Sequence, residues 1–362
     1  MKLLAESEIN TGRQREADLA KFVCLLGMVI VHCFDCFVSF SETSSTVQFV
    51  FLYVLNCIFG GGTFMFCMGL GLAYSAKNTP EQIMKRGLKI FLLGYLLNLL
   101  CALSYLILLK DIALFITYLV GLDIMQFAGL ALILFGLLKK LRNADIAIGI
   151  AAVLLSITGT LIGTVDLGNP ALNIFCGLFF GSFDYDWLTG GVFPLFNWFI
   201  FVAAGYLFAK YILRRCENKD RLYLICSSTA AVIVAVYLII AVPGRLGMMS
   251  SVLRFHHMRI YDALIVIAGA VLALGVYNAL LHIIPETIQK AVVSVSATIN
   301  AVYCCQWVII AWAVSIWVIN GKKELSDGVI ILIGLFIFAI SAALAQFYKK
   351  WKNSRRKKKN TV

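Results

Sequence analysis

Two side chains capable of acid–base chemistry, His32 and Asp35, lie in one apolar stretch near the N-terminus, residues 20–40. An imidazole can accept and return a proton near neutral pH, so His32 is the candidate base. In a helix Asp35 lies at i+3, within reach of the same ring, where it could orient the ring and stabilise its charged form. Ionisable groups in a span are costly and usually face a polar cavity, although a histidine can also serve only as an interhelical hydrogen-bonding group. We therefore predict that His32 and Asp35 are catalytic.

Basic residues occupy positions that suit phosphate binding. Lys21 lies eleven residues before His32. This is almost three helical turns, so both side chains project from one face, roughly 16 Å apart along the axis. A second basic group, Lys85, Arg86 and Lys89, begins a later apolar run. We predict that these residues and Lys21 bind a ligand with several phosphates; the alternative for the second group is ordinary anchoring at the membrane surface.

A third polar group, His256, His257, Arg259 and Asp262, precedes and begins the apolar run 259–282. We predict that it binds the acceptor substrate, while an ordinary solvated loop is the alternative. Adjacent histidines on a helix project about 100° apart, so they are not expected to chelate a metal.

The stretch Cys33 to Cys36, beside His32, raises the question of a metal or redox site. No second ligand pair with suitable spacing follows, and thiols in apolar runs behave as small hydrophobic groups. We predict no metal.

The chain that carries these residues has 362 residues, of which 61% are hydrophobic and only 14% charged. Its mean hydropathy is +0.90. About a quarter of the residues in a soluble domain are charged, so the bilayer is the solvent that suits this chain. The sequence predicts an all-α, polytopic transmembrane helical bundle with about ten spans in one domain, residues 1–348, followed by a basic tail, 349–362. The expected spans are 20–40, 47–75, 88–109, 117–138, 144–163, 191–212, 222–242, 259–282, 296–319 and 328–348, and Gly60-Gly61-Gly62 is expected to kink or split the second.

The distribution of basic residues predicts the orientation. Of the 31 Lys and Arg residues, 25 fall in segments that are cytoplasmic if both termini are cytoplasmic, and 6 fall on the other side. This agrees with the positive-inside rule. The net charge of +12 therefore indicates contact with anionic membrane lipids and does not require nucleic acid.

Several motifs resemble known membrane acyltransferases. Lys21, ten further residues and His32 resemble the first-helix signature of acyltransferase family 3. The stretches 64–75, 121–131 and 191–198 resemble segments of heparan-α-glucosaminide N-acetyltransferase-like proteins, so the resemblance covers roughly residues 15–205. Later, Asn300 to Gln306 is similar to a family 3 helix, but Gln306 stands where histidine is usual.

The resemblance implies an acyl-CoA-dependent membrane O- or N-acyltransferase. Acetyl-CoA would donate from the cytoplasm, and a sugar or cell-envelope glycan would accept on the other side. His32 would be the base or the acyl carrier, Asp35 would orient it, and Lys21, Lys85, Arg86 and Lys89 would hold the phosphates. The expected location is the cell membrane, with multiple passes, and a homodimer is compatible with the Phe- and Trp-rich outer faces.

Two alternatives stay open. A secondary transporter is compatible with the spans, the His–Asp pair and the broken second run, although no internal repeat is found. A non-catalytic membrane protein of the same fold is compatible with Gln306.

Overall fold

The computed structural model of the chain describes residues 3–37, 50, 55, 60–181, 191–250 and 252–359. In these residues the regular structure is helical, and an isolated antiparallel bridge joins Leu4 to Cys216. Nine described helical segments are long and apolar enough to cross a membrane. Their outer side chains are apolar and exposed, as the 80% exposed Leu161 and 73% exposed Ile239 illustrate. The prediction of an all-α polytopic bundle is therefore confirmed.

The nine segments and their helices are as follows: Arg15–Phe37 (α1); Pro80–Leu109 (α5, Pro80–Ser104, and η2, Tyr105–Leu109); Ile112–Leu138 (α6, Ile112–Val120, and α7, Ile124–Leu138); Ala144–Ile162 (α8); Leu195–Arg215 (α10, Leu195–Tyr211, and η3, Leu213–Arg215); Lys219–Gly244 (α11); Ile260–Leu281 (α13); Ile299–Ile319 (α15); and Asp327–Arg355, within α16 (Asp327–Lys359). Shorter elements are α4 (Gly61–Ala73), α9 (Pro170–Gly177), η4 (Gly247–Met249), α12 (Val252–His256) and α14 (Glu286–Ser296).

The second expected span is broken where the glycines indicated. Its described helix, α4, begins at Gly61, and Gly60 before it has an extended backbone. Residues 47–49, 51–54 and 56–59 of that run lie outside the described residues. Short as it is, α4 is mostly buried. It crosses α10 so closely that a Cβ on Gly69 would stand 2.0 Å from the Val202 carbonyl oxygen, which explains a glycine in this helix.

A second break, not expected from the apolar pattern, divides 112–138 into α6 and α7. Residues Gly121 to Asp123 are non-helical, and Asp123 begins α7 with a capping box in which Gln126 bonds back to the Asp123 backbone. Asp123 Oδ1 also accepts from the Ile124 N–H at 2.7 Å. A helix therefore starts inside a span, and its cap brings a carboxylate to membrane depth.

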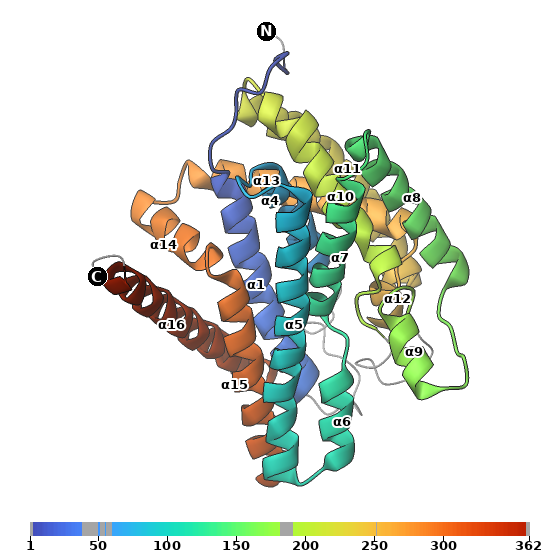
Figure 1. Ribbon diagram of the computed structural model, residues 1–362, viewed down its shortest axis with the longest axis vertical. Helices are drawn as coiled ribbons and strands as arrows, with labels where there is room; N and C mark the ends of the chain where they lie inside the picture. The colour runs from blue at the N-terminus through green and yellow to red at the C-terminus, as the bar shows by residue number, and fades with distance from the viewer. Residues whose placement is uncertain are drawn as a thin grey trace.

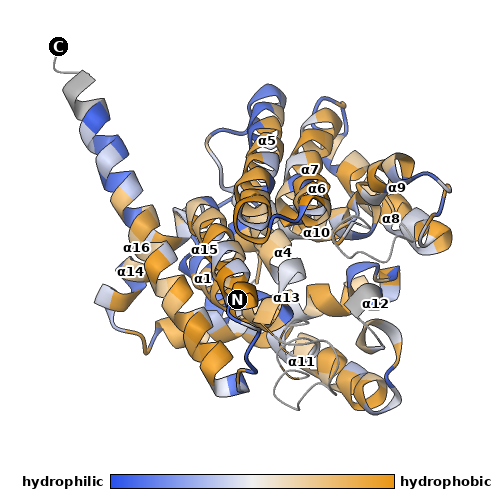
Figure 2. Cartoon of the chain, turned by 90° about the horizontal axis from the view of Figure 1, so that it is seen from below, coloured by the Kyte–Doolittle hydropathy of each residue, from blue (hydrophilic) through white to orange (hydrophobic). Residues whose placement is uncertain are grey.

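The helices form one bundle, in which α4 packs against α1, α10 and α13 (Figure 1). Helix α16 crosses α1 and α15 obliquely, and its C-terminal end projects from the bundle. The hydrophobic colouring dominates the helices, and hydrophilic colour marks the last turns of α16 (Figure 2). The N-terminal segment is tied to the turn after α10 by the Ala5 N–H, which donates to the Arg215 carbonyl at 2.7 Å.

Candidate functional site

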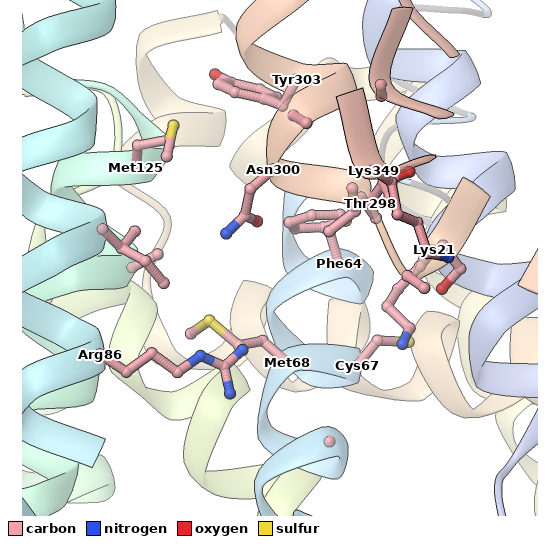
Figure 3. A pocket seen from close by; sticks show the side chains of 18 of the residues that line it. Lys21, Phe64, Cys67, Met68, Arg86, Met125, Thr298, Asn300, Tyr303 and Lys349 are labelled. Carbon is pink, nitrogen blue, oxygen red and sulfur yellow. The ribbon is translucent and has the colours of Figure 1, made fainter. Parts of the chain in front are cut away.

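A cavity of about 470 Å³ opens between α1, α4, α5, α7, α15 and α16. Its lining joins the first third of α1 to the last turns of α16, which are more than 300 residues apart in the chain. Gly71 lines the cavity from α4, and no atom lies within 4 Å of the place where a Cβ would stand. The missing side chain therefore leaves free space there. Figure 3 shows Lys21 and Arg86 reaching in from different sides, with Tyr303 and Met125 at the other end.

Four cationic side chains line this cavity: Lys21, Arg86, Lys349 and Lys352. Among the described residues of the lining, none is Asp or Glu. Such a surface favours a ligand with several negative charges, and an arginine guanidinium can bind phosphate through two parallel hydrogen bonds. Sequence reasoning found the first two cations but assigned the last two to a membrane-anchoring tail.

The other predicted phosphate ligands, Lys85 and Lys89, are exposed and do not line the cavity. The reason is helical geometry: Arg86 and Ile90, four residues apart, share the face of α5 that meets the cavity, while Lys85 and Lys89 lie on the neighbouring face about 100° away.

Lys21 is held in place by a buried carboxylate. Asp18 is 3% exposed. Its Oδ1 lies 3.1 Å from Lys21 Nζ and accepts from Ser296 Oγ at 2.7 Å, and its Oδ2 accepts from Arg13 Nε at 2.6 Å. Ser296 is itself part of the lining. Asp18 therefore fixes both the cation and the turn between α14 and α15 that faces it.

The end of the cavity marked by Tyr303 leads to His32. The Tyr303 hydroxyl donates to Asp123 Oδ2 at 2.5 Å and accepts from Trp307 Nε1 at 2.8 Å. The Trp307 indole stacks on the His32 ring, with centroids 4.2 Å apart and planes inclined by 30°. The ring centroids of His32 and Tyr303 are 6.3 Å apart. The imidazole thus lies just behind the side chain that ends the cavity.

The hydrogen bond to the His32 imidazole comes from a different residue than expected. Gln306 Nε2 lies 3.2 Å from His32 Nδ1. No hydrogen bond between Asp35 and His32 is found among the described residues. The i+3 spacing allowed such a contact, but α15 supplies the ring's neighbours instead, from Tyr303, Gln306 and Trp307 on one helical face.

The polar group at 256–262, which we predicted to bind the acceptor, is partly buried. His257 is 8% exposed and its Nε2 lies 2.9 Å from the Gly191 carbonyl oxygen. Asp262 is fully buried, and its Oδ1 accepts from the Tyr237 hydroxyl at 2.8 Å. The segment after α11 folds back against α10 and α11, so these two side chains pack within the protein. His256 and Arg259 keep partial exposure.

Burial also decides the charge state of the two histidines, which lie outside the spanning segments. Although His256 is partly exposed as a whole, its Nδ1 is buried. This desolvation lowers the pKa of His256 to about 3, and burial lowers that of His257 as well. Removing an imidazole from water disfavours its cationic form. Both rings are therefore neutral at physiological pH and pack as aromatic groups, His256 edge-on to Phe193 with centroids 5.3 Å apart.

Within the described part of the chain, no three His, Cys, Asp or Glu residues come together as a metal site. Cys33 is buried and Cys36 half-buried, and both are free thiols.

Comparison with known proteins gives one family. The family described as "Heparan-alpha-glucosaminide N-acetyltransferase, catalytic" matches residues 13–242. No curated protein and no solved structure matches the chain. The matched stretch includes His32, Lys21 and Arg86, while α15 and the basic end of α16 lie beyond it.

Proposed function

The chain belongs to the heparan-alpha-glucosaminide N-acetyltransferase catalytic family, and from this premise we propose that it moves an acyl group, acetyl in the first instance, from acyl-CoA to a sugar or cell-envelope glycan across the membrane. The family match supports a multi-pass membrane N-acetyltransferase in general. The donor, the acceptor, the orientation and the cell membrane as its location are our proposal.

The observation that carries the proposal is the cavity with four cations and no acidic side chain in its described lining. CoA has three phosphate groups and needs such a surface at one end. Lys349 and Lys352 on α16 and Arg86 on α5 would bind these phosphates, and Lys21 would complete the set. Lys85 and Lys89 lie on the adjacent, exposed face of α5, where they would raise the local positive potential without touching the ligand.

The rest of the cavity suits the remainder of an acyl-CoA. Asn300 and Thr298 offer polar groups, and Phe64, Met65 and Met125 offer apolar surface to the pantetheine arm. The thioester would then lie at the Tyr303 end, next to His32. Lys21 and His32 are separated by about 16 Å along α1, which an extended arm can span.

His32 would act as the base in the transfer. The acceptor hydroxyl or amine loses its proton to the imidazole as its oxygen or nitrogen bonds to the thioester carbon. The carbon–sulfur bond then breaks, and the imidazolium returns the proton to the departing CoA thiolate. Alternatively His32 would carry the acyl group itself before the acceptor arrives. Asp35, one turn further on, would stabilise the positive charge through space.

The acceptor would arrive from the other end of the bundle. Helix α11 has 26 residues and leads away from the turn tied to the N-terminal segment, so the residues that follow it lie about one membrane thickness away. His256 and Arg259 are half-exposed there and would contact the acceptor, while His257 and Asp262 would hold the segment beneath them. The counts of Lys and Arg support a cytoplasmic cavity, with the basic tail on anionic lipids.

One experiment tests the transfer itself. Protein purified in detergent is supplied with acetyl-CoA labelled in the acetyl group and with glucosamine as the probe acceptor, and labelled product is measured. The proposal expects transfer by the wild type and none by His32→Ala at equal protein amount and equal melting temperature. Full transfer by His32→Ala would remove His32 from the chemistry.

A secondary transporter is the second candidate, because the break between α6 and α7 places a helix start inside a span. Discontinuous helices mark the binding sites of many transporters. If the protein is a transporter, it should take up a solute into vesicles, and CoA should not raise its melting temperature.

A further inference from the structure

Gln306 is the side chain best placed to control the state of the His32 ring. It is fully buried on α15, and its Nε2 faces His32 Nδ1 at 3.2 Å. Its Oε1 is buried and has no hydrogen-bond partner among the described residues. The amide nitrogen therefore contacts the imidazole, and the amide oxygen has no hydrogen-bond partner in the described part of the chain.

The contact determines where the ring proton sits. An amide NH₂ group can only donate, so the nitrogen that it meets must be the unprotonated one. In a neutral imidazole the single proton then lies on Nε2. In this state Nε2 is a donor and cannot accept a proton from an incoming hydroxyl or amine.

The ring cannot escape this contact by turning. Trp307 covers one face of it, with ring centroids 4.2 Å apart. The indole is itself held, because its Nε1 donates to the Tyr303 hydroxyl, which donates to Asp123. The ring therefore stays in place, and the amide is the part that can change.

We propose that Gln306 is a positioning residue that selects the tautomer of His32: in the resting protein it holds the proton on Nε2, and a half-turn of its amide releases Nε2 to act as the base. This inference rests on the proposed acyl transfer. The rotation is coupled to an exchange of protons with water, in which Nδ1 takes up one proton and Nε2 releases one, so the ring stays neutral. Oε1 then accepts from Nδ1–H, and it gives up no other described partner in doing so. Nε2 can then take the acceptor's proton, and Oε1 stabilises the imidazolium until the proton passes to the CoA thiolate.

A glutamine suits this task better than a carboxylate would. A carboxylate only accepts, so it would hold Nδ1–H at all times. An amide offers a donor and an acceptor from one side chain and can stabilise either tautomer. The resting enzyme would thus be protected from using water as acceptor, because its base is not yet formed.

The test uses the nitrogen resonances of histidine, which differ between the two tautomers. The chain has four histidines, so protein labelled with ¹⁵N-histidine gives few signals, and His32→Asn identifies that of His32. We expect the Nε2–H tautomer in the wild type and the Nδ1–H or doubly protonated form in Gln306→Glu. Gln306→Leu should give a mixture. A wild-type signal of the Nδ1–H form, or a signal unchanged in Gln306→Leu, would overturn the proposal.

Kinetics give a second readout. Gln306→Leu should lower kcat at least tenfold and leave KM for acetyl-CoA within about twofold, since Gln306 does not line the cavity. Gln306→Glu should keep kcat near or above that of the wild type, which shows that the position folds. Cys305→Ala, the half-buried neighbour on α15, is the matched control and should change neither parameter. If no acyl transfer is found, the spectra still show which tautomer of His32 is present. Failure of the proposed function can therefore be distinguished from failure of the proposed role of Gln306.

Discussion

The hydroxyl of Tyr303, on α15, donates a hydrogen bond to Oδ2 of Asp123, 180 residues away at the start of α7, with the two oxygens 2.5 Å apart. The same hydroxyl accepts from Trp307 Nε1, and Trp307 stacks on His32. One phenol thus connects the break in the Ile112–Leu138 span with the candidate base, at the end of the cavity that leads to it. These contacts hold the Trp307 indole against the His32 ring and so position that ring.

Tyr303→Phe should weaken both stability and turnover. The change leaves Asp123 Oδ2 and Trp307 Nε1 without this partner, and a buried polar group without a partner costs about 1–3 kcal/mol. Trp307 is then free to shift, and a small misplacement of the reacting ring lowers turnover roughly tenfold or more. The melting temperature and kcat in detergent check both effects.

The control is Tyr348→Phe, at a second tyrosine in the cavity lining that is 51% exposed. It should leave kcat and the melting temperature unchanged. Equal effects of the two changes would show that Tyr303 acts only as part of the cavity wall.

Alanine substitutions at two glycines of α4 should differ in their effect on the stability of the protein. A Cβ on Gly69 would stand 2.0 Å from the Val202 carbonyl oxygen, whereas one on Gly71 meets no atom within 4 Å. We expect Gly69→Ala to destabilise the protein by about 1–3 kcal/mol or more, through overpacking against backbone, and Gly71→Ala to leave its stability nearly unchanged. Melting temperatures compare the pair. Equal values would contradict the close crossing of α4 and α10.

Gly71→Leu extends the same comparison to the ligand. Its side chain would enter the cavity that Gly71 lines, so it should weaken CoA binding while the protein stays folded. Unchanged CoA affinity in this variant would place the ligand elsewhere.

The packing of His256 should make the protein less stable in acid. Burial lowers its pKa in the folded protein to about 3, against 6.5 for an unperturbed histidine. The unfolded chain therefore binds more protons, so the contribution of this ring is complete above about pH 6.5 and is lost progressively as the pH falls towards 3. The melting temperature should decrease faster with falling pH in the wild type than in His256→Phe, which keeps an aromatic ring without the titration. Parallel curves would show that the ring is hydrated.

Much of the fold could be predicted from the sequence because its signals are local. Apolar runs of about 20 residues predicted the spans, and Gly60-Gly61-Gly62 predicted the break before α4. The break before α7 was missed because Gly121 and Asp123 are too few to interrupt an apolar pattern. Their effect comes from the cap that Asp123 makes on its own helix.

The site was predictable only from signals that are local in the sequence. Lys21 and Arg86 were predicted to bind phosphate, the first from its spacing to His32 and the second from a basic cluster. Lys349 and Lys352 were predicted to belong to a surface tail, because nothing in the sequence shows that α16 returns to the cavity. Asp35 was expected to hydrogen-bond the His32 ring because it is only three residues away in the sequence. Gln306 was not expected to do so, because it is distant in the sequence.

The most direct test of the central claim is the thermal stabilisation of the purified protein by CoA. A ligand that binds only the folded state raises its apparent stability. We expect millimolar CoA and acetyl-CoA to raise the melting temperature of the wild type and of the control Lys85→Ala/Lys89→Ala, whose changed residues do not line the cavity. The variant Arg86→Ala/Lys349→Ala/Lys352→Ala should lose most of this shift. No shift in the wild type, or equal shifts in all three proteins, would contradict CoA binding in this cavity.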